Sequence, residues 1–99
     1  MTHALKIETN YFKDIIYGNK NFEVRKNDRD FHVDDYIALN ELSVTREEYT
    51  GRSILVKVTS IVDDERFCKE GFIIMGLEKC SISGNGDIGT VLDGEERKL

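Results

Sequence analysis

Short runs of alternating apolar and polar residues dominate this sequence, and they restrict the fold more than any other feature. Alternation with a period of two is typical of a β-strand that buries one face. The pattern predicts strands at residues 5–8, 21–26, 36–42 and 53–62, and a nearly all-apolar strand at 72–77. Because the alternation changes phase late in the fourth run, we expect a β-bulge near Thr59 or Ser60.

One segment departs from this period. In residues 10–17, apolar side chains recur at three- and four-residue spacing, which predicts a short amphipathic helix. Asn10 is placed to cap its first turn, and Gly18 suits the left-handed residue that follows a helix end. One helix cannot supply the crossovers of a parallel α/β sheet. We therefore expect an α+β fold that is mainly β, a small, partly open β-barrel with one short N-terminal helix.

The length of 99 residues allows one compact domain, which we expect at residues 1–80. Residues 81–99 hold half of the eight glycines and few aliphatic side chains, so we expect a loosely ordered extension. Within it, residues 88–92 are apolar enough to add an edge strand. No apolar run approaches the roughly 20 residues of a membrane helix, so we expect a cytoplasmic protein that does not bind a membrane.

Neither the cysteines nor the histidines show the spacing of a metal site. Cys68 and Cys80 are not a CxxC pair, and we expect free thiols rather than zinc ligands or a disulfide. His3 and His32 have no carboxylate or Cys at ligand spacing, and we expect both on the surface. Phosphate-binding glycine loops and dinucleotide motifs are also absent from the sequence. We therefore predict no metal and no organic cofactor.

Charge is distributed unevenly along the chain. Residues 1–30 contain six Lys or Arg and five Asp or Glu side chains, whereas the rest contains eight and fourteen. The formal net charge of −5 would repel a long duplex. We therefore expect any nucleic-acid site to be local and to lie in the N-terminal third.

Three charged residues after the predicted helix form the main candidate site. Lys20 follows the helix end, while Glu23 and Arg25 are two apart on one strand and project from the same face. Phe22 and Val24 alternate with them, and we expect these two to face the core. A guanidinium binds a phosphate or a base edge, an ammonium supplies a mobile charge, and a carboxylate accepts from an exocyclic amine.

Residues near this site extend the candidate cleft. We expect Asn27 and Arg29 to wall it, and Tyr11 or Tyr17 to offer a stacking face for a base. Arg52, which follows an expected exposed hairpin connection at 43–51, is a weaker candidate for a phosphate contact.

Two simpler interpretations stay open. In the first, Glu23 and Arg25 only neutralise each other on a solvated strand face. In the second, residues 27–30 form only a tight turn whose Asn and Asp side chains bond their own backbone.

The candidate site also carries a family resemblance. Residues 18–25, GNKNFEVR, fit the pattern G-x-K-x-x-E-x-R that marks the ASCH domains of the PUA-like superfamily. With further matches at 5–7, 11–12, 26–31, 49–52 and 71–74, the chain resembles a small bacterial and phage branch of unassigned function. A proline before the helix and a Gly-Asp turn, usual in that branch, are absent here. The resemblance, over about residues 4–78, implies a PUA-like β-barrel associated with RNA.

The first function that we expect is an RNA- or nucleotide-binding module that uses the charged cleft. An enzyme is one alternative, because some small ASCH proteins are amidohydrolases acting on acetylcytidine. That resemblance implies a catalytic Lys20 and a distant Glu, Glu65 or Glu70, but Glu23 stands where those enzymes have a Thr. In this chain Lys20 would instead act as nucleophile or base, with Glu23 as the carboxylate that handles the proton.

A protein-binding regulator of phage type is the other alternative. It would bind a basic host protein through an acidic surface. That surface comprises Asp34, Asp35, Glu47, Glu48 and residues 63–65.

Overall fold

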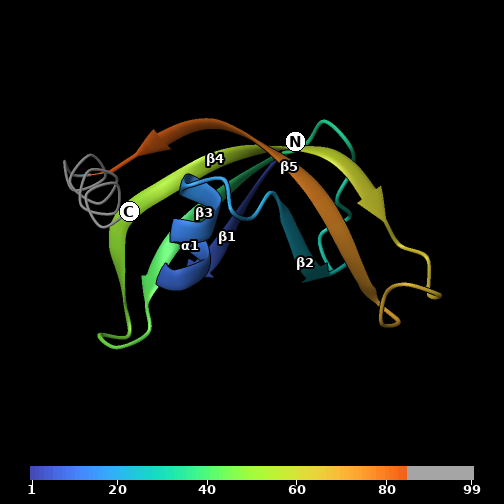
Figure 1. Ribbon diagram of the computed structural model, residues 1–99, viewed down its shortest axis with the longest axis horizontal. Coiled ribbons are helices and arrows are strands. Elements are labelled where there is room, and N and C mark those ends of the chain that lie inside the picture. Colours follow the sequence, from blue (N-terminus) through green and yellow to red (C-terminus); the bar gives the residue numbers. More distant parts are fainter. Residues whose placement is uncertain (85–99) are drawn as a thin grey trace.

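The computed structural model describes residues 1–84 of the chain. Figure 1 shows a strongly curved sheet with a helix beneath it. The elements in chain order are β1 (Thr2–Glu8), α1 (Thr9–Ile16), β2 (Phe22–Lys26), β3 (Tyr36–Ser43), β4 (Glu48–Val62) and β5 (Phe72–Ser83). The prediction of a mainly β, α+β fold with one short N-terminal helix is therefore confirmed.

The five strands form one sheet in the order β1-β3-β4-β5-β2. β1 pairs with β3 in parallel, and the other three pairs are antiparallel. The sheet curls into an open half-barrel with β1 and β2 at its two edges, and α1 lies inside the curve (Figure 1). The two edges are the elements that position the candidate site.

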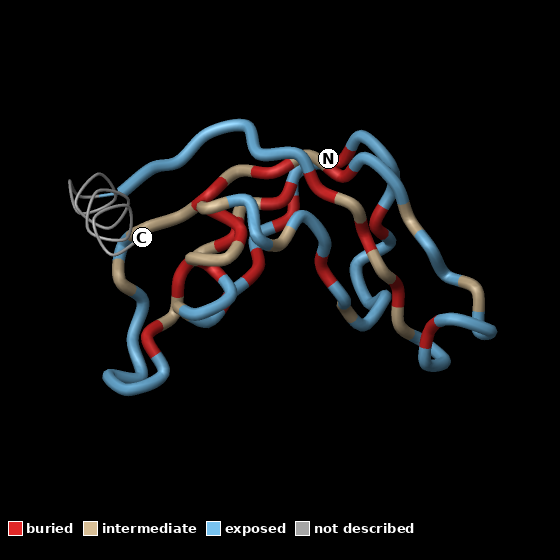
Figure 2. Tube along the Cα trace, in the orientation of Figure 1, coloured by how far each residue is buried: buried red, intermediate tan, exposed pale blue. Residues whose placement is uncertain are grey.

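The hydrophobic core fills the concave side of the sheet. Figure 2 shows the buried residues concentrated along the strands and the helix, while the connecting segments are mostly exposed. Removing one such side chain from water contributes about 1.5–3 kcal/mol. The core contains Leu5, Ile7, Phe12, Ile15, Ile16, Phe31, Ile37, Leu39, Ile54, Val56, Val58, Ile73, Met75 and Leu77.

The long β3–β4–β5 meander contains the irregularities that shape the half-barrel. The register of β4 against β5 shifts between Val58 and Ser60, which confirms the predicted bulge. The β3–β4 hairpin is tighter than expected, because Glu48 already pairs with Ser43. The expected exposed hairpin connection over 43–51 is present but shorter, because residues 48–51 already belong to β4, and residues 44–49 are exposed as expected.

The last strand crosses the expected domain boundary at residue 80. β5 continues to Ser83 because residues 81–83 pair with residues 53–55 of β4. The remainder of the expected extension, including 88–92, lies outside the described residues. Within residues 1–84 no helix is long and apolar enough to cross a membrane.

The orientation of β2 is the reverse of the one expected. Glu23 pairs with Met75 and is buried, whereas Phe22 and Val24 are 43% and 51% exposed. The inward face of this edge strand borders the open side of the half-barrel, where charged groups bind one another and the backbone of β1. The apolar alternation of β2 therefore marks its outer face.

Two smaller predictions were also wrong. Asn10 does not cap α1, because β1 runs directly into the helix and α1 already begins at Thr9. Glu8 is the N-cap residue and makes no side-chain cap bond, while Asn10 lies inside the first turn. His3 is buried beside Leu5 on the inward face of β1, where its Nε2 lies 2.8 Å from Asp35 Oδ2.

Other local predictions are confirmed. Gly18 adopts a φ of 77° directly after the helix end. Cys68 and Cys80 are free thiols, the first buried and the second exposed. The side chain of His32 is exposed.

Candidate functional site

The two sheet edges meet along a seam that arginine side chains bridge. Within residues 1–84, β1 and β2 do not pair with each other. Instead, Arg25 Nη2 donates to the carbonyl oxygen of Lys6 at 2.7 Å, and Arg29 Nη1 donates to that of Ala4 at 3.0 Å. Alternate residues of an edge strand direct their carbonyls to the same side. Two guanidiniums from the β2 side therefore bind the free edge of β1 and leave space between the strands.

A charged cluster of Lys20, Glu23 and Arg25 lies at this seam. Lys20 Nζ is 2.7 Å from Glu23 Oε1, and Arg25 Nε is 2.6 Å from Glu23 Oε2. The Glu23 side chain is only 5% exposed, against 17% for Lys20 and 25% for Arg25. A carboxylate buried this far needs such charge-assisted partners. The structure thus brings together the three residues that the sequence singled out.

The end of α1 fixes the position of Lys20. Gly18 turns the chain with its positive φ, and the backbone N–H groups of Asn19 and Lys20 both donate to the carbonyl of Asp14, at 2.9 and 3.1 Å. These bonds occupy a carbonyl that the helix end would otherwise leave unpaired. The Lys20 backbone is consequently anchored to the helix, and its side chain reaches the start of β2.

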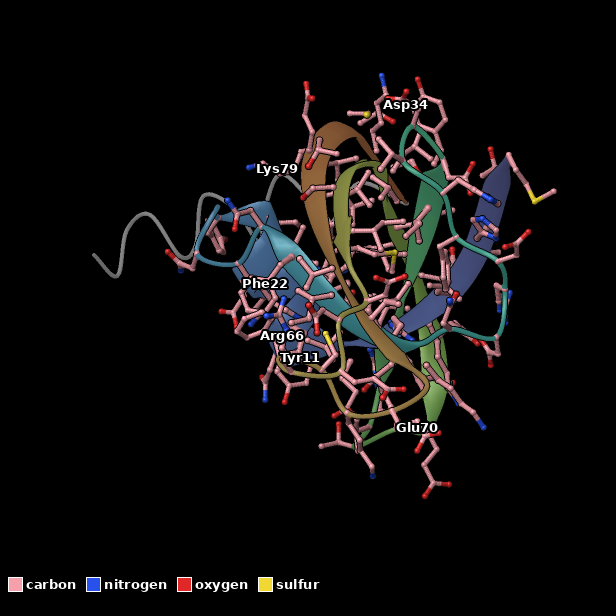
Figure 3. All side chains as sticks on the ribbon, turned by 90° about the vertical axis from the view of Figure 1, so that its right-hand side faces the viewer. Tyr11, Phe22, Asp34, Arg66, Glu70 and Lys79 are labelled. Atoms are coloured by element: carbon pink, nitrogen blue, oxygen red, sulfur yellow. The ribbon has the colours of Figure 1, made fainter. Side chains whose placement is uncertain are left out.

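Two aromatic rings flank the Lys20 ammonium. Its Nζ lies 4.7 Å from the centroid of the Tyr11 ring and 5.6 Å from that of Phe22, both within cation–π range. Figure 3 shows the labelled Tyr11 and Phe22 on the same side of the molecule. Tyr17, the other expected stacking residue, packs against the core. Phe22 was missed as a cleft residue because its alternation with Val24 resembled a core pattern.

These groups line a cleft of about 780 Å³, which we call the first cleft. Its volume lies within the usual range of small-molecule sites. Cations and carboxylates are equal in number on its walls. The charged lining residues are Lys6, Lys20, Arg25, Glu8, Asp14 and Glu23.

A second cleft of about 380 Å³ continues along the seam. It shares Lys6 and Arg25 with the first cleft and adds Lys26, Arg29 and Asp28. Arg29 thus lies in the neighbouring cleft rather than beside Lys20.

Asn27 lines neither of these two clefts. Its backbone N–H donates to the carbonyl of Gly71 at 2.8 Å, which directs this part of the loop toward β5 and away from β1.

Arg52, the weaker phosphate candidate, is committed to a buried carboxylate. Its Nε and Nη2 donate to the two oxygens of Glu41 at 2.5 and 2.8 Å, and Thr50 adds a hydroxyl at 2.6 Å. Burial raises the pKa of the Glu41 carboxyl, but the bonds from Arg52, Thr50 and Thr9 outweigh it, so this pKa lies below its usual value. Glu41 lies on the same strand face as the apolar residues Ile37 and Leu39, and this alternation was the sequence signal that its side chain is buried.

Asp35 is a third buried carboxylate, and the expectation that it belongs to an acidic surface is therefore wrong. The side chain of His3 and the backbone N–H of His32 bond it and lower its pKa to about 2. Asp34 beside it stays exposed.

The other expected catalytic groups lie elsewhere. Glu65 and Glu70 are exposed in the β4–β5 connection and line neither cleft; Figure 3 shows Glu70 at the periphery. In the described part of the chain, no group of three or more His, Cys, Asp or Glu side chains is placed to hold a metal ion.

Residues 2–77 match a family described as "Domain of unknown function (DUF3850)". The chain belongs to this family. The matched region includes every residue that lines the two clefts. The region that matches DUF3850 therefore includes residues of every strand and the helix, together with the whole candidate site.

A phage protein provides a second comparison. The chain is 31% identical over 61 residues to the "Uncharacterized 12.9 kDa protein in GpA 3'region" of Escherichia phage P2. The match covers 62% of this chain and 54% of the phage protein, and so spans about half the length of that relative.

Proposed function

We propose that this DUF3850 protein is an ASCH-type, PUA-like domain that binds RNA or a nucleotide in the first cleft. The open half-barrel and the meeting of Lys20, Glu23 and Arg25 of the G-x-K-x-x-E-x-R segment support this proposal. The family description names no function, so the proposal rests on the chemistry of the cleft.

One observation carries the proposal: a cation and two aromatic rings share a single opening. Lys20 lies between Tyr11 and Phe22, whose side chains are about half exposed, and Arg25 lies beside it on the same carboxylate. Proteins that bind unpaired bases combine an aromatic stacking face with Lys or Arg for the phosphate. The cleft offers both within reach of one nucleotide.

For Glu23 we propose a role other than the selection of a base edge. Both of its oxygens are engaged, by Lys20 and by Arg25, and its side chain is almost inaccessible. Glu23 thus serves to position the two cations rather than to select a base edge. Because carboxylates on the walls balance the cations, the first cleft suits an aromatic group better than a run of phosphates.

The amidohydrolase alternative is less well supported. The Lys20 Nζ is paired with Glu23 and lies against two rings, so these contacts already occupy the group that would have to attack a substrate. The distant Glu that this chemistry needs, Glu65 or Glu70, lines neither cleft.

A titration of short single-stranded RNA by fluorescence polarisation tests the proposal. Lys20→Ala removes the ammonium, and we expect the affinity to fall at least about tenfold, since a bond to a charged group contributes about 1.5–3 kcal/mol. The matched control is Lys69→Ala, which removes an equal charge outside both clefts and should leave the affinity within twofold.

Equal losses in the two variants, or no binding by the wild type, would contradict the proposal. The same preparations should be incubated with acetylcytidine. Deacetylation that disappears in Lys20→Ala would replace the binding proposal with the enzyme alternative. If neither occurs, the exposed acidic residues Asp34, Glu47 and Glu48 become the place to look for a protein partner.

A further inference from the structure

The two clefts along the seam differ sharply in charge. The first has as many carboxylates as cations and two aromatic walls. The second is lined by four cations and one carboxylate, Asp28. An uncharged aromatic group and an anion would therefore be drawn to neighbouring positions on one continuous surface.

We propose that the second cleft is a phosphate subsite, and that the ligand is a phosphorylated nucleoside whose base lies in the first cleft. This inference rests on the proposed function and specifies its ligand. The shared walls, Lys6 and Arg25, stand where the sugar would pass from one cleft to the other.

The two arginines have N–H donors to spare. A guanidinium carries five N–H groups. Arg29 gives one to the Ala4 carbonyl, while Arg25 gives one to Glu23 and one to the Lys6 carbonyl. Within residues 1–84 no further bond engages these two guanidiniums, and their remaining donors are available to an anion.

The bonds to the edge of β1 also hold both side chains in place before a ligand arrives. A site held in this way loses less conformational entropy on binding. A guanidinium fork fits a phosphate better than a point charge does.

Lys6 and Lys26 complete the subsite from opposite edges of the sheet. Both are exposed, one on β1 and the other at the end of β2. A phosphate in the second cleft would neutralise the like charges of the two side chains that line it.

The test compares three classes of probe by isothermal titration calorimetry: the common nucleosides, their 5′- and 3′-monophosphates, and ribodinucleotides with one internal phosphodiester. We expect the wild type to bind a phosphorylated probe at least about tenfold more tightly than the matching nucleoside. Tight binding of a monophosphate identifies a free nucleotide as the source of the phosphate, and preference for the dinucleotide identifies an RNA chain. Either result supports the subsite.

Three variants test whether the second cleft causes the tighter binding of phosphorylated probes. The double variant Lys26→Ala/Arg29→Ala should bind phosphorylated probes no better than nucleosides, with nucleoside affinity unchanged. Because Arg29 also bridges the seam, Lys26→Ala alone is the safer variant, and it should lose part of the gain. Arg66→Ala, an exposed arginine outside both clefts, is the charge-matched control and should retain the whole gain.

Equal affinity of the wild type for nucleosides and phosphorylated probes would overturn the subsite and leave the proposed function standing. The same holds if Lys26→Ala and Arg66→Ala reduce the gain equally. If the wild type binds no probe of any class, the proposed function fails together with the inference.

Discussion

Glu23 holds two cations at the seam, and its substitution tests that role at the level of one residue. Glu23→Gln keeps the shape of the side chain but leaves Lys20 and Arg25 without a counter-charge. We expect the free energy of unfolding, measured by urea denaturation, to fall by about 2 kcal/mol. Glu48→Gln, whose partner Arg46 lies 3.7 Å away at an exposed position, should change it by less than about 0.5 kcal/mol. A similar small loss in both variants would contradict the structural role of Glu23.

Asp35 gives the molecule a defined response to acid. Bonds from His3 and His32 lower the pKa of its carboxyl from 3.8 to about 2. A carboxyl with a lowered pKa in the folded state stabilises the fold above its unfolded-state value, and this contribution disappears as the pH falls through the folded-state value. Part of the stability should therefore be lost between pH 3.8 and about 2.

Unfolding measured at several pH values across this window tests the role of Asp35. We expect Asp35→Asn to flatten the dependence of the unfolding free energy on pH. Asp34→Asn, at the exposed neighbouring position, should leave the slope close to that of the wild type. If Asp35→Asn keeps the wild-type slope, other carboxyls cause the acid response.

The sequence indicated the burial of some single residues but not the side chains that they contact. The phase of β1 places His3 with Leu5 and Ile7, so its burial was readable from alternation. Glu41 was readable in the same way on β3. Their partners Asp35 and Arg52 were not, because 32 and 11 residues separate the members of these pairs and no local rule specifies such contacts.

At the scale of elements, β2 shows why alternation alone can mislead. The pattern fixes that Phe22 and Val24 share one face, but not which face is inward. Among residues 1–84, β2 pairs only with β5, and its inward side meets the seam, where Glu23 and Arg25 have polar partners. The identity of the edge strands depends on the long-range pairing of the sheet, which the sequence does not specify locally.

Matched substitutions of two valines test the orientation of β2. Val24→Ala, on the outer face, should lower the free energy of unfolding by less than about 0.5 kcal/mol. Val56→Ala, at a fully buried position of β4, should lower it by about 2 kcal/mol. Equal large losses in urea denaturation would mean that Val24 faces the core.

At the scale of the whole molecule, the incomplete closure of the barrel creates the candidate site. The alternating runs and the single helix were sufficient to predict a small, partly open β structure. They did not reveal that β1 pairs in parallel with β3, nor that the seam would therefore fall between β1 and β2. The cluster of Lys20, Glu23 and Arg25 was predictable because its members are close in sequence, whereas the bridging of the seam was not.

Binding of a nucleotide at this seam is tested most directly by a chemical-shift map. The backbone amide signals of the ¹⁵N-labelled protein should be assigned and followed by NMR during titration with nucleoside monophosphates and short RNA. We predict that the shifts concentrate in residues 4–8, 19–26 and 28–29, on both sides of the seam. Shifts concentrated in the β4–β5 connection, or no shifts at saturating ligand, would contradict the account.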